Sequence, residues 1–237
     1  LPVIIFSHGG SWRSGSPDDY GFVARGLAPE GFVVVLAGYR LGDAGKYPAM
    51  VEDTAAAVAW THANIANYGG DPDRIFISGH SAGAYNAAMV ALDRQWLGRQ
   101  GLESNVLKGV IGLAGPYDFY PFDSDSTKAA FGETPRPEQT QPINFARGDA
   151  PPFLLLSGEA DTVVKPRNSR ALATAINEAG GTAETAFFPD MDHYQIVMAT
   201  ASPWRRDPKI VNAITNFVNE TARVADEASV PVQAESR

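Results

Sequence analysis

Ser81 is the residue of this chain whose sequence context most strongly suggests covalent chemistry. It lies at the centre of the pentapeptide GHSAG (residues 79–83), between a strand-like run at 74–78 (RIFIS) and a helical pattern at 82–97. A G-x-S-x-G pattern in this context places the serine on a tight strand-to-helix turn, with its hydroxyl above a sheet and its backbone at a helix N-terminus. We therefore expect a nucleophile. The alternative is an ordinary helix N-cap, a position that serine also favours.

A serine hydroxyl needs a base to take its proton, and histidine is the usual choice. The chain has four histidines. His62 falls on the apolar stripe of a predicted helix, which favours a structural role. His80 adjoins the serine in sequence, so its side chain is expected to point away from the hydroxyl, and His8 is expected to brace a glycine-rich loop. His193 is the predicted base, because it lies in a loop directly after a predicted strand at 183–188.

The base needs an acid that fixes its tautomer and stabilises its cation. Asp161 follows the predicted strand at 152–157, which gives the chain order Ser81, Asp161, His193 that is typical of one class of triad. Glu159 and Asp192 are rivals. Glu159 lies closer to the strand, where it is expected to cap the turn, and Asp192 adjoins the histidine, an awkward geometry for bonding its ring. Asp161 is the predicted acid, with a solvated turn carboxylate as the alternative.

A second glycine-containing loop, SHGGSW at residues 7–12, follows the first predicted strand. Attack on a carbonyl carbon places negative charge on the oxygen, and backbone N–H groups must point at it. Glycines let a loop approach a substrate without a Cβ in the way. We expect the oxyanion donors to be the N–H groups of Gly10 and Ser11, together with that of Ala82 after the nucleophile. The alternative is an ordinary glycine-rich turn.

These residues require strands whose carboxyl ends meet at one edge. Short apolar runs alternate along the chain with helical patterns, an arrangement typical of a mostly parallel sheet with helices on both faces. The predicted strands lie at 2–7, 31–37, 74–78, 108–113, 152–157 and 183–188, and the predicted helices at 18–28, 49–68, 82–97, 167–179 and 208–223.

Taken together, these motifs resemble the esterase and lipase group of α/β-hydrolases that carries an HGG-type loop. The matching pieces are HGGSW, GYRL (38–41), YPAMVEDTAAAVAW (47–60), DPDRIFISGHSAG (71–83), GPYD (115–118), PFLLLSGEADTVV (152–164) and PDMDH (189–193). The resemblance implies an α/β-hydrolase fold and the catalytic and oxyanion roles already assigned.

Two departures from that group bear on the substrate and on the fold. Ser11 stands where the hormone-sensitive-lipase-like branch has a third glycine, and the pattern HGG-x-W is instead similar to kynurenine formamidases and to some carboxylesterases and feruloyl-type esterases. The group also has one or more strands before the HGG strand, whereas this chain starts at that strand. We expect that the numbering begins inside a longer polypeptide, and the missing strands would leave a sheet edge exposed.

A single domain is expected over residues 1–223, with a cap insertion at 116–151 and a flexible tail at 224–237. The predicted substrate-binding residues are Trp12, His80, Tyr117 and Phe119. Aromatic side chains in the cap either line an acyl or aryl pocket or form the cap's own small core, and both interpretations stay open. Trp12 either stacks on an aromatic substrate or wedges the oxyanion loop, with the wedge slightly favoured.

The composition limits the partners. The chain of 237 residues has 19 basic and 27 acidic residues, a net charge of −8, which argues against nucleic acid. It has no cysteine, which excludes disulfides, thiolate metal sites and a cysteine nucleophile. No apolar stretch is long enough for a membrane span. We expect no metal and no cofactor. A cytoplasmic location is favoured, and the compartment and oligomeric state stay open.

The predicted function is hydrolysis of small carboxylic esters through an acyl-enzyme on Ser81. Hydrolysis of aryl formamides by the same machinery is the alternative that HGG-x-W permits. A non-catalytic binding module on the same fold is the third reading, and it is disfavoured because all three triad residues are in the sequence.

Overall fold

The computed structural model describes residues 1–201 and 208–229, and its centre is a six-stranded sheet. All strand pairings are parallel, and the spatial order is β2-β1-β3-β4-β5-β6. The strands are β1 (Val3–Ser7), β2 (Val33–Ala37), β3 (Ile75–His80), β4 (Leu107–Leu113), β5 (Phe153–Gly158) and β6 (Ala183–Phe188). The predicted α/β-hydrolase sheet is thus confirmed.

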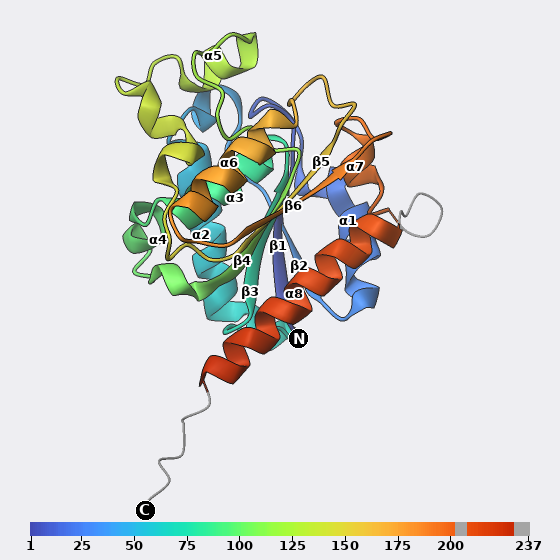
Figure 1. Cartoon of the computed structure of the whole chain (residues 1–237). Helices are drawn as coiled ribbons and strands as arrows, with labels where there is room; N and C mark the ends of the chain where they lie inside the picture. The colour runs from blue at the N-terminus through green and yellow to red at the C-terminus, as the bar shows by residue number, and fades with distance from the viewer. Residues whose placement is uncertain (202–207, 230–237) are drawn as a thin grey trace, which may run out of the picture.

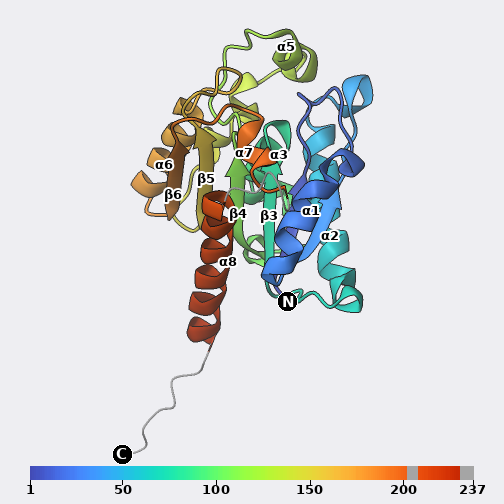
Figure 2. The same ribbon diagram turned by 90° about the vertical axis from the view of Figure 1, so that its right-hand side faces the viewer.

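Helices cover both faces of this sheet (Figures 1 and 2). Those with α-helical geometry are α1 (Gly21–Leu27), α2 (Ala49–Asn64), α3 (Ala82–Leu92), α4 (Gln95–Arg99), α5 (Asp125–Phe131), α6 (Arg167–Glu178), α7 (Gln195–Met198) and α8 (Pro208–Ser229). Helices α2, α3 and α6 pack on one face, and α1, α7 and α8 pack on the other.

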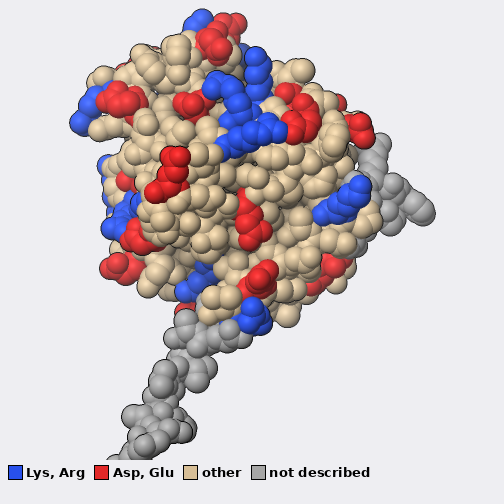
Figure 3. All heavy atoms as spheres, viewed as in Figure 1, with Lys and Arg blue, Asp and Glu red and all other residues tan. Residues whose placement is uncertain are grey.

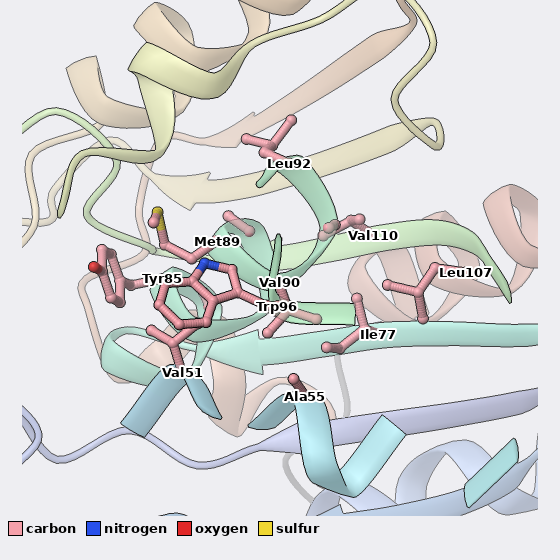
Figure 4. Packing of buried hydrophobic residues seen from close by; sticks show 14 of the residues in the cluster. Val51, Ala55, Ile77, Tyr85, Met89, Val90, Leu92, Trp96, Leu107 and Val110 are labelled. Atoms are coloured by element: carbon pink, nitrogen blue, oxygen red, sulfur yellow. The ribbon is translucent and has the colours of Figure 1, made fainter. Parts of the chain in front are cut away.

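Alternation along each strand divides the core into two halves, because successive side chains of a strand point to opposite faces. Val3 and Ile5 belong to the cluster under α2 and α3, whereas Ile4 and Phe6 belong to the cluster under α8. Strands β1, β3 and β5 therefore consist almost entirely of buried residues, as expected where both faces are covered, whereas the edge strand β6 has Glu184 and Thr185 exposed. Figure 4 shows part of the first cluster, with Val51 and Ala55 of α2, Met89 of α3, Trp96 of α4 and Ile77 of β3.

The predicted helices at 18–28 and 49–68 are shorter in the structure, where 3₁₀ turns flank α1 and follow α2, and two further helices differ more clearly in their bounds. The helix expected at 82–97 is divided at Asp93, whose backbone is extended and whose carboxylate accepts from the N–H of Gln95 at 3.2 Å. Helix α8 continues to Ser229 instead of stopping at residue 223, because the sequence there is rich in helix-forming residue types. The predicted flexible tail at 224–237 is therefore helical at its start, and its residues 230–237 lie outside the described residues.

The segment at 116–151 starts beyond the carboxyl ends of the strands, where α5 lies, and its last residues return to the amino end of β5 (Figure 1). It contains α5 and two short 3₁₀ turns, Pro137–Thr140 and Pro142–Phe145. Two amide side chains hold its first turn. Asn168 Oδ1 accepts from the N–H groups of Tyr117 and Asp118, each at 2.9 Å, and Gln141 Oε1 accepts from that of Phe119 at 2.7 Å. The start of the segment is thus fixed to α6 and to its own second half.

Charges are interspersed on the face of the molecule shown in Figure 3, where basic and acidic side chains lie close together and no patch of one sign covers that face. Among the described residues, no helix combines the length and the apolar character that crossing a bilayer requires. The same residues contain no group of three or more histidine or acidic side chains placed to hold a metal ion.

Candidate active site

Three side chains from three strand ends form a hydrogen-bonded series. Ser81 follows β3, Asp161 follows β5 and His193 follows β6. The Nε2 atom of His193 lies 2.9 Å from Ser81 Oγ, and its Nδ1 atom lies 2.7 Å from Asp161 Oδ2. Because the carboxylate only accepts, Nδ1 carries the proton and Nε2 is free to take the serine proton. The structure therefore brings the three predicted catalytic residues together.

The backbone at Ser81 is strained in the way that the motif predicts. Its φ of 53° and ψ of −119° lie in a region that non-glycine residues rarely adopt. The flanking glycines remove side chains that would collide with neighbouring backbone. A Cβ at Gly79 would lie 2.3 Å from the carbonyl carbon of Gly83, and a Cβ at Gly83 would lie 2.1 Å from the carbonyl oxygen of Ser7. The elbow thus requires both glycines and packs directly on β1.

The environment of Asp161 decides between the three candidate acids. Its second oxygen accepts from the N–H groups of Val163 and Val164 at 2.9 and 2.8 Å, which aims the first at His193. Glu159 instead pairs with Arg170 on α6. Asp192 accepts from the backbone of the following turn, including Tyr194 N at 2.9 Å.

The loop after β1 places free backbone donors beside the serine. Gly10, Ser11 and Trp12 all have positive φ, and the carbonyl of Gly10 turns back to accept from Arg13 N at 3.0 Å. The N–H groups of Gly10, Ser11 and Ala82 donate to no acceptor in the described part of the chain. For Ala82 this is expected of the first turn of a helix. The arrangement suits a developing oxyanion.

A cavity of about 350 Å³ opens in front of the serine. Its wall on one side is aromatic and aliphatic, and the rim is polar with two exposed cations, Lys165 and Arg167. The lining residues that the argument uses are Ser11, Trp12, Ser81, Ala82, Phe119 and Val164. An adjoining open hollow is lined by Gly10, Ser11, Arg13 and Tyr194, among others.

Two of the four predicted substrate-binding residues line this cavity and two do not. Trp12 and Phe119 are in the wall. Tyr117 is fully buried, and its hydroxyl occupies the space where a Cβ of Gly112 would be, at 2.0 Å. His80 is also buried, between Tyr20 and the backbone of the histidine loop. Tyr117 is an aromatic residue of the predicted cap and His80 adjoins the serine in sequence, and neither property gives the direction of a side chain.

Trp12 acts structurally as a wedge while one part of it lines the cavity. It is 4% exposed, and its indole N–H donates to Asn86 Oδ1 at 3.2 Å. Its ring meets Tyr85 and Phe131 edge-on, with centroids 5.3 and 4.8 Å apart. Phe119 also packs on Phe131, at 5.3 Å, so the cap aromatics form a small core and a pocket wall at once.

The remaining predicted histidines have structural surroundings. His8 stacks on Tyr39 with centroids 4.4 Å apart, and burial lowers its pKa. Its backbone carbonyl accepts from the Tyr39 hydroxyl at 2.9 Å, so the loop is braced through this residue as expected. His62 lies partly buried on α2, outside the cavity.

Several residues that support the site carry no sequence signal. Asn86 anchors the tryptophan, while Asn168 and Gln141 hold the start of the cap. Tyr20 donates toward His80. Each is an isolated polar residue in a helix or turn, with no motif and no spacing that distinguishes it from a surface residue.

Comparison with known proteins gives the family. A family model described as BD-FAE matches residues 1–176. The chain belongs to the BD-FAE family. The esterase LipQ of Mycobacterium tuberculosis is 32% identical over 235 residues, covering 92% of this chain and 55% of LipQ. The esterase LipC of the same organism is 31% identical, covering 72% of this chain and 47% of LipC. This BD-FAE member thus spans about half the length of these curated relatives.

A solved structure confirms the fold of this BD-FAE member. A truncated carbohydrate esterase from gut microbiota superimposes with a TM-score of 0.81 at 24% identity, covering 94% of this chain and 86% of that chain. The α/β-hydrolase architecture is therefore shared with an esterase, at an identity that speaks only for the fold.

Proposed function

We propose that this BD-FAE member hydrolyses small carboxylic esters through an acyl-enzyme on Ser81. The observation that carries the proposal is the continuous hydrogen-bonded series from Asp161 through His193 to the serine hydroxyl, beside the N–H groups of Gly10 and Ser11, which have no acceptor among the described residues. A binding module would have no need to keep the strained serine backbone together with an oriented base. The names of the relatives LipQ and LipC support the same activity.

The first half of the reaction transfers the acyl group. As Ser81 Oγ bonds to the carbonyl carbon, its proton passes to Nε2 of His193, and Asp161 stabilises the resulting cation. The oxyanion of the tetrahedral intermediate accepts from the Ser11 and Ala82 N–H groups, with Gly10 as a further donor. The bond to the alcohol oxygen then breaks, and that oxygen takes the proton from Nε2.

The second half releases the acid. A water molecule attacks the acyl carbon while His193 Nε2 takes its proton, and the tetrahedral intermediate collapses with return of that proton to Ser81 Oγ. The cavity in front of the serine has an apolar wall at Trp12, Phe119 and Val164, which suits a small acyl or aryl group. The aryl formamide alternative has no observation in its favour.

Steady-state turnover of p-nitrophenyl acetate tests the proposal. We expect wild type to turn over and the variant His193→Ala to lose about 10³-fold or more in kcat, because the serine then lacks its base. The variant His62→Ala is the matched control, since it removes a histidine outside the cavity. Absence of turnover by wild type across acetyl, butyryl and aryl esters would overturn the proposal. Faster hydrolysis of N-formylkynurenine than of any ester would replace it with the formamide activity.

A further inference from the structure

The side chain of His80 connects two loops of the site that are far apart in sequence. It is 2% exposed, and its Nε2 atom lies 2.8 Å from the backbone carbonyl oxygen of His193, while its Nδ1 atom lies 3.0 Å from the hydroxyl of Tyr20. A carbonyl only accepts, so Nε2 carries the proton. Nδ1 of the neutral ring is then an acceptor, and the Tyr20 hydroxyl donates to it.

The hydroxyl of Tyr20 also touches the oxyanion loop. Burial raises the pKa of Tyr20, and a hydrogen bond from the backbone of Gly9 works against that rise. A Cβ at Gly9 would lie 2.8 Å from this hydroxyl and 2.9 Å from His80 Nδ1. The first glycine of the HGG loop is therefore required by the approach of these two side chains, whereas Gly10 is required by its positive φ of 122°.

One close approach and two hydrogen bonds form a series between the two loops. The Tyr20 hydroxyl lies against Gly9 and donates to His80, and His80 donates to the carbonyl of His193. Tyr20 is itself held in a short turn that Asp19 closes by accepting from Ser16 N at 2.9 Å. One end of the series is thus the loop that offers oxyanion donors, and the other is the backbone that carries the catalytic base.

We propose that Tyr20 and His80 are positioning residues that fix the distance between the oxyanion loop and the base His193. This inference rests on the proposed ester hydrolysis. A tetrahedral intermediate must contact both the loop N–H groups and the imidazole at once, so small errors in their separation lower the rate of the chemical step. Neither residue touches the substrate cavity, so substrate binding is unaffected.

The neutral state of His80 suits this role. Burial and the neighbouring His193, with ring centroids 4.8 Å apart, lower the pKa of His80 to about 3. The groups that face it are the rings of His193 and Tyr20 and, through space, the Asp161 carboxylate. His80 therefore stays uncharged when His193 takes up its proton during catalysis, and the series keeps its direction.

The test is a double-mutant cycle in which kcat and KM are measured with p-nitrophenyl acetate. Tyr20→Phe removes one oxygen atom and keeps the ring contacts with Phe6 and Phe22, each at 5.6 Å. We expect kcat to fall about 10-fold with KM changed less than about twofold, as for loss of a hydrogen bond that orients reacting groups. Tyr47→Phe is the matched control, because it loses one hydrogen bond, to Gln139, outside the series.

The second arm replaces the histidine. His80→Leu is expected to lower kcat about 30-fold, and the double variant with Tyr20→Phe is expected to be no worse than His80→Leu alone, because the two residues act through one series. His80→Gln keeps an N–H donor and is expected to recover about a third of the lost kcat or more. If His80→Leu does not fold, Tyr20→Phe and His80→Gln still decide the question.

The outcomes are separable. If wild type is active and the fold-losses in kcat of Tyr20→Phe and His80→Leu multiply in the double variant, the positioning role is overturned and ester hydrolysis stands. The same conclusion follows if Tyr20→Phe and Tyr47→Phe have equal kcat. A rise in KM at unchanged kcat also overturns it. A wild type that neither turns over nor reacts with a fluorophosphonate overturns the proposed function, and the positioning role with it.

Discussion

The elbow at residues 79–83 and the oxyanion loop at residues 7–12 lie at the ends of neighbouring strands, yet different contacts hold them. The elbow is fixed by backbone, since its glycines lie against the main chain of β1 and of the elbow itself. The oxyanion loop has backbone hydrogen bonds of its own, such as Arg13 N to Gly10 O at 3.0 Å, and is held in addition by side chains from elsewhere, including Tyr39, Asn86 and the Tyr20–His80 pair. A backbone-packed turn depends on a few adjacent residues, so a short motif describes it, whereas the support of the other loop is spread over the chain.

The largest expected effect is at the elbow, from Gly83→Ala. The added Cβ would lie 2.1 Å from the carbonyl oxygen of Ser7, so either β1 or α3 must move. We expect the free energy of unfolding in urea to fall by about 3 kcal/mol or more, with loss of ester turnover. Gly98→Ala is the matched control, because nothing lies within 4 Å of its Cβ position. In this variant we expect the free energy of unfolding to rise by about 0.5 kcal/mol. Equal effects at both glycines would refute the backbone account of the elbow.

The second expected effect is a dependence of stability on pH through His80. The unfolded chain takes up this proton near pH 6.5 and the native chain only at about 3. Because the unfolded state binds the proton first, stability falls as the pH is lowered from 6.5 towards 3, by about 2–3 kcal/mol between pH 7 and pH 4.5. Urea titrations at the two pH values should show a shallower fall for His80→Gln, which cannot titrate. Identical falls would mean that His80 is not buried as a neutral group.

The third expected effect is on the oxyanion loop and is smaller than at the elbow. In Gly9→Ala the two closest atoms to the new Cβ belong to side chains, the Tyr20 hydroxyl at 2.8 Å and His80 Nδ1 at 2.9 Å, and the nearest backbone atom, the His80 carbonyl oxygen, is at 3.3 Å. Side-chain tips yield more easily than main chain, so we expect a loss of about 1–2 kcal/mol in the free energy of unfolding together with a lower kcat. A loss as large as that of Gly83→Ala would show that backbone contacts hold both loops.

The smallest expected effect comes from Trp12→Phe, which keeps one aromatic ring of the wedge and removes the five-membered ring with its N–H donor. Asn86 Oδ1 then loses the N–H group that donates to it, and Nδ2 of the same side chain already has no partner in the described residues. We expect about 1 kcal/mol less stability, measured by thermal unfolding. Trp60→Phe is the control, since that ring is 50% exposed, and it should change stability by less than about 0.5 kcal/mol. If Trp12→Phe and Trp60→Phe have the same stability, the indole N–H of Trp12 does not help to hold the oxyanion loop.

The contrast between local and remote contacts also explains which features of the fold and site are predictable from the sequence. The central strands β1, β3, β4 and β5 are predictable because each is a short, mainly apolar run buried on both faces, and the edge strands β2 and β6 keep enough β-branched or aromatic residues to be recognised. The series Ser81, Asp161, His193 is predictable because each residue directly follows a strand, and parallel strands end at one edge. Both the strands and the catalytic series are therefore readable from residues that are adjacent in sequence.

The residues that line the cavity were less predictable. Tyr117 of the cap and His80 at the end of β3 were expected to bind substrate, and both are buried outside the cavity. Tyr20, Asn86 and Gln141 are single polar residues whose role depends on contacts with remote parts of the chain, which no periodicity encodes. The helix at the start of the segment 224–237 was not predicted either. The small and polar residues of this segment are typical of a flexible tail, although several of them are also helix-forming residue types.

The central claim is that Ser81, activated by His193, is the one residue that becomes acylated. Intact-protein mass spectrometry after brief exposure to a fluorophosphonate measures this directly. We predict one added phosphonyl group on wild type, located on the peptide that contains Ser81, none on Ser81→Ala, and labelling slowed about 10²-fold or more in His193→Ala. Labelling of Ser81→Ala at the rate of wild type, or a wild type that stays unmodified while it hydrolyses esters, would contradict the account.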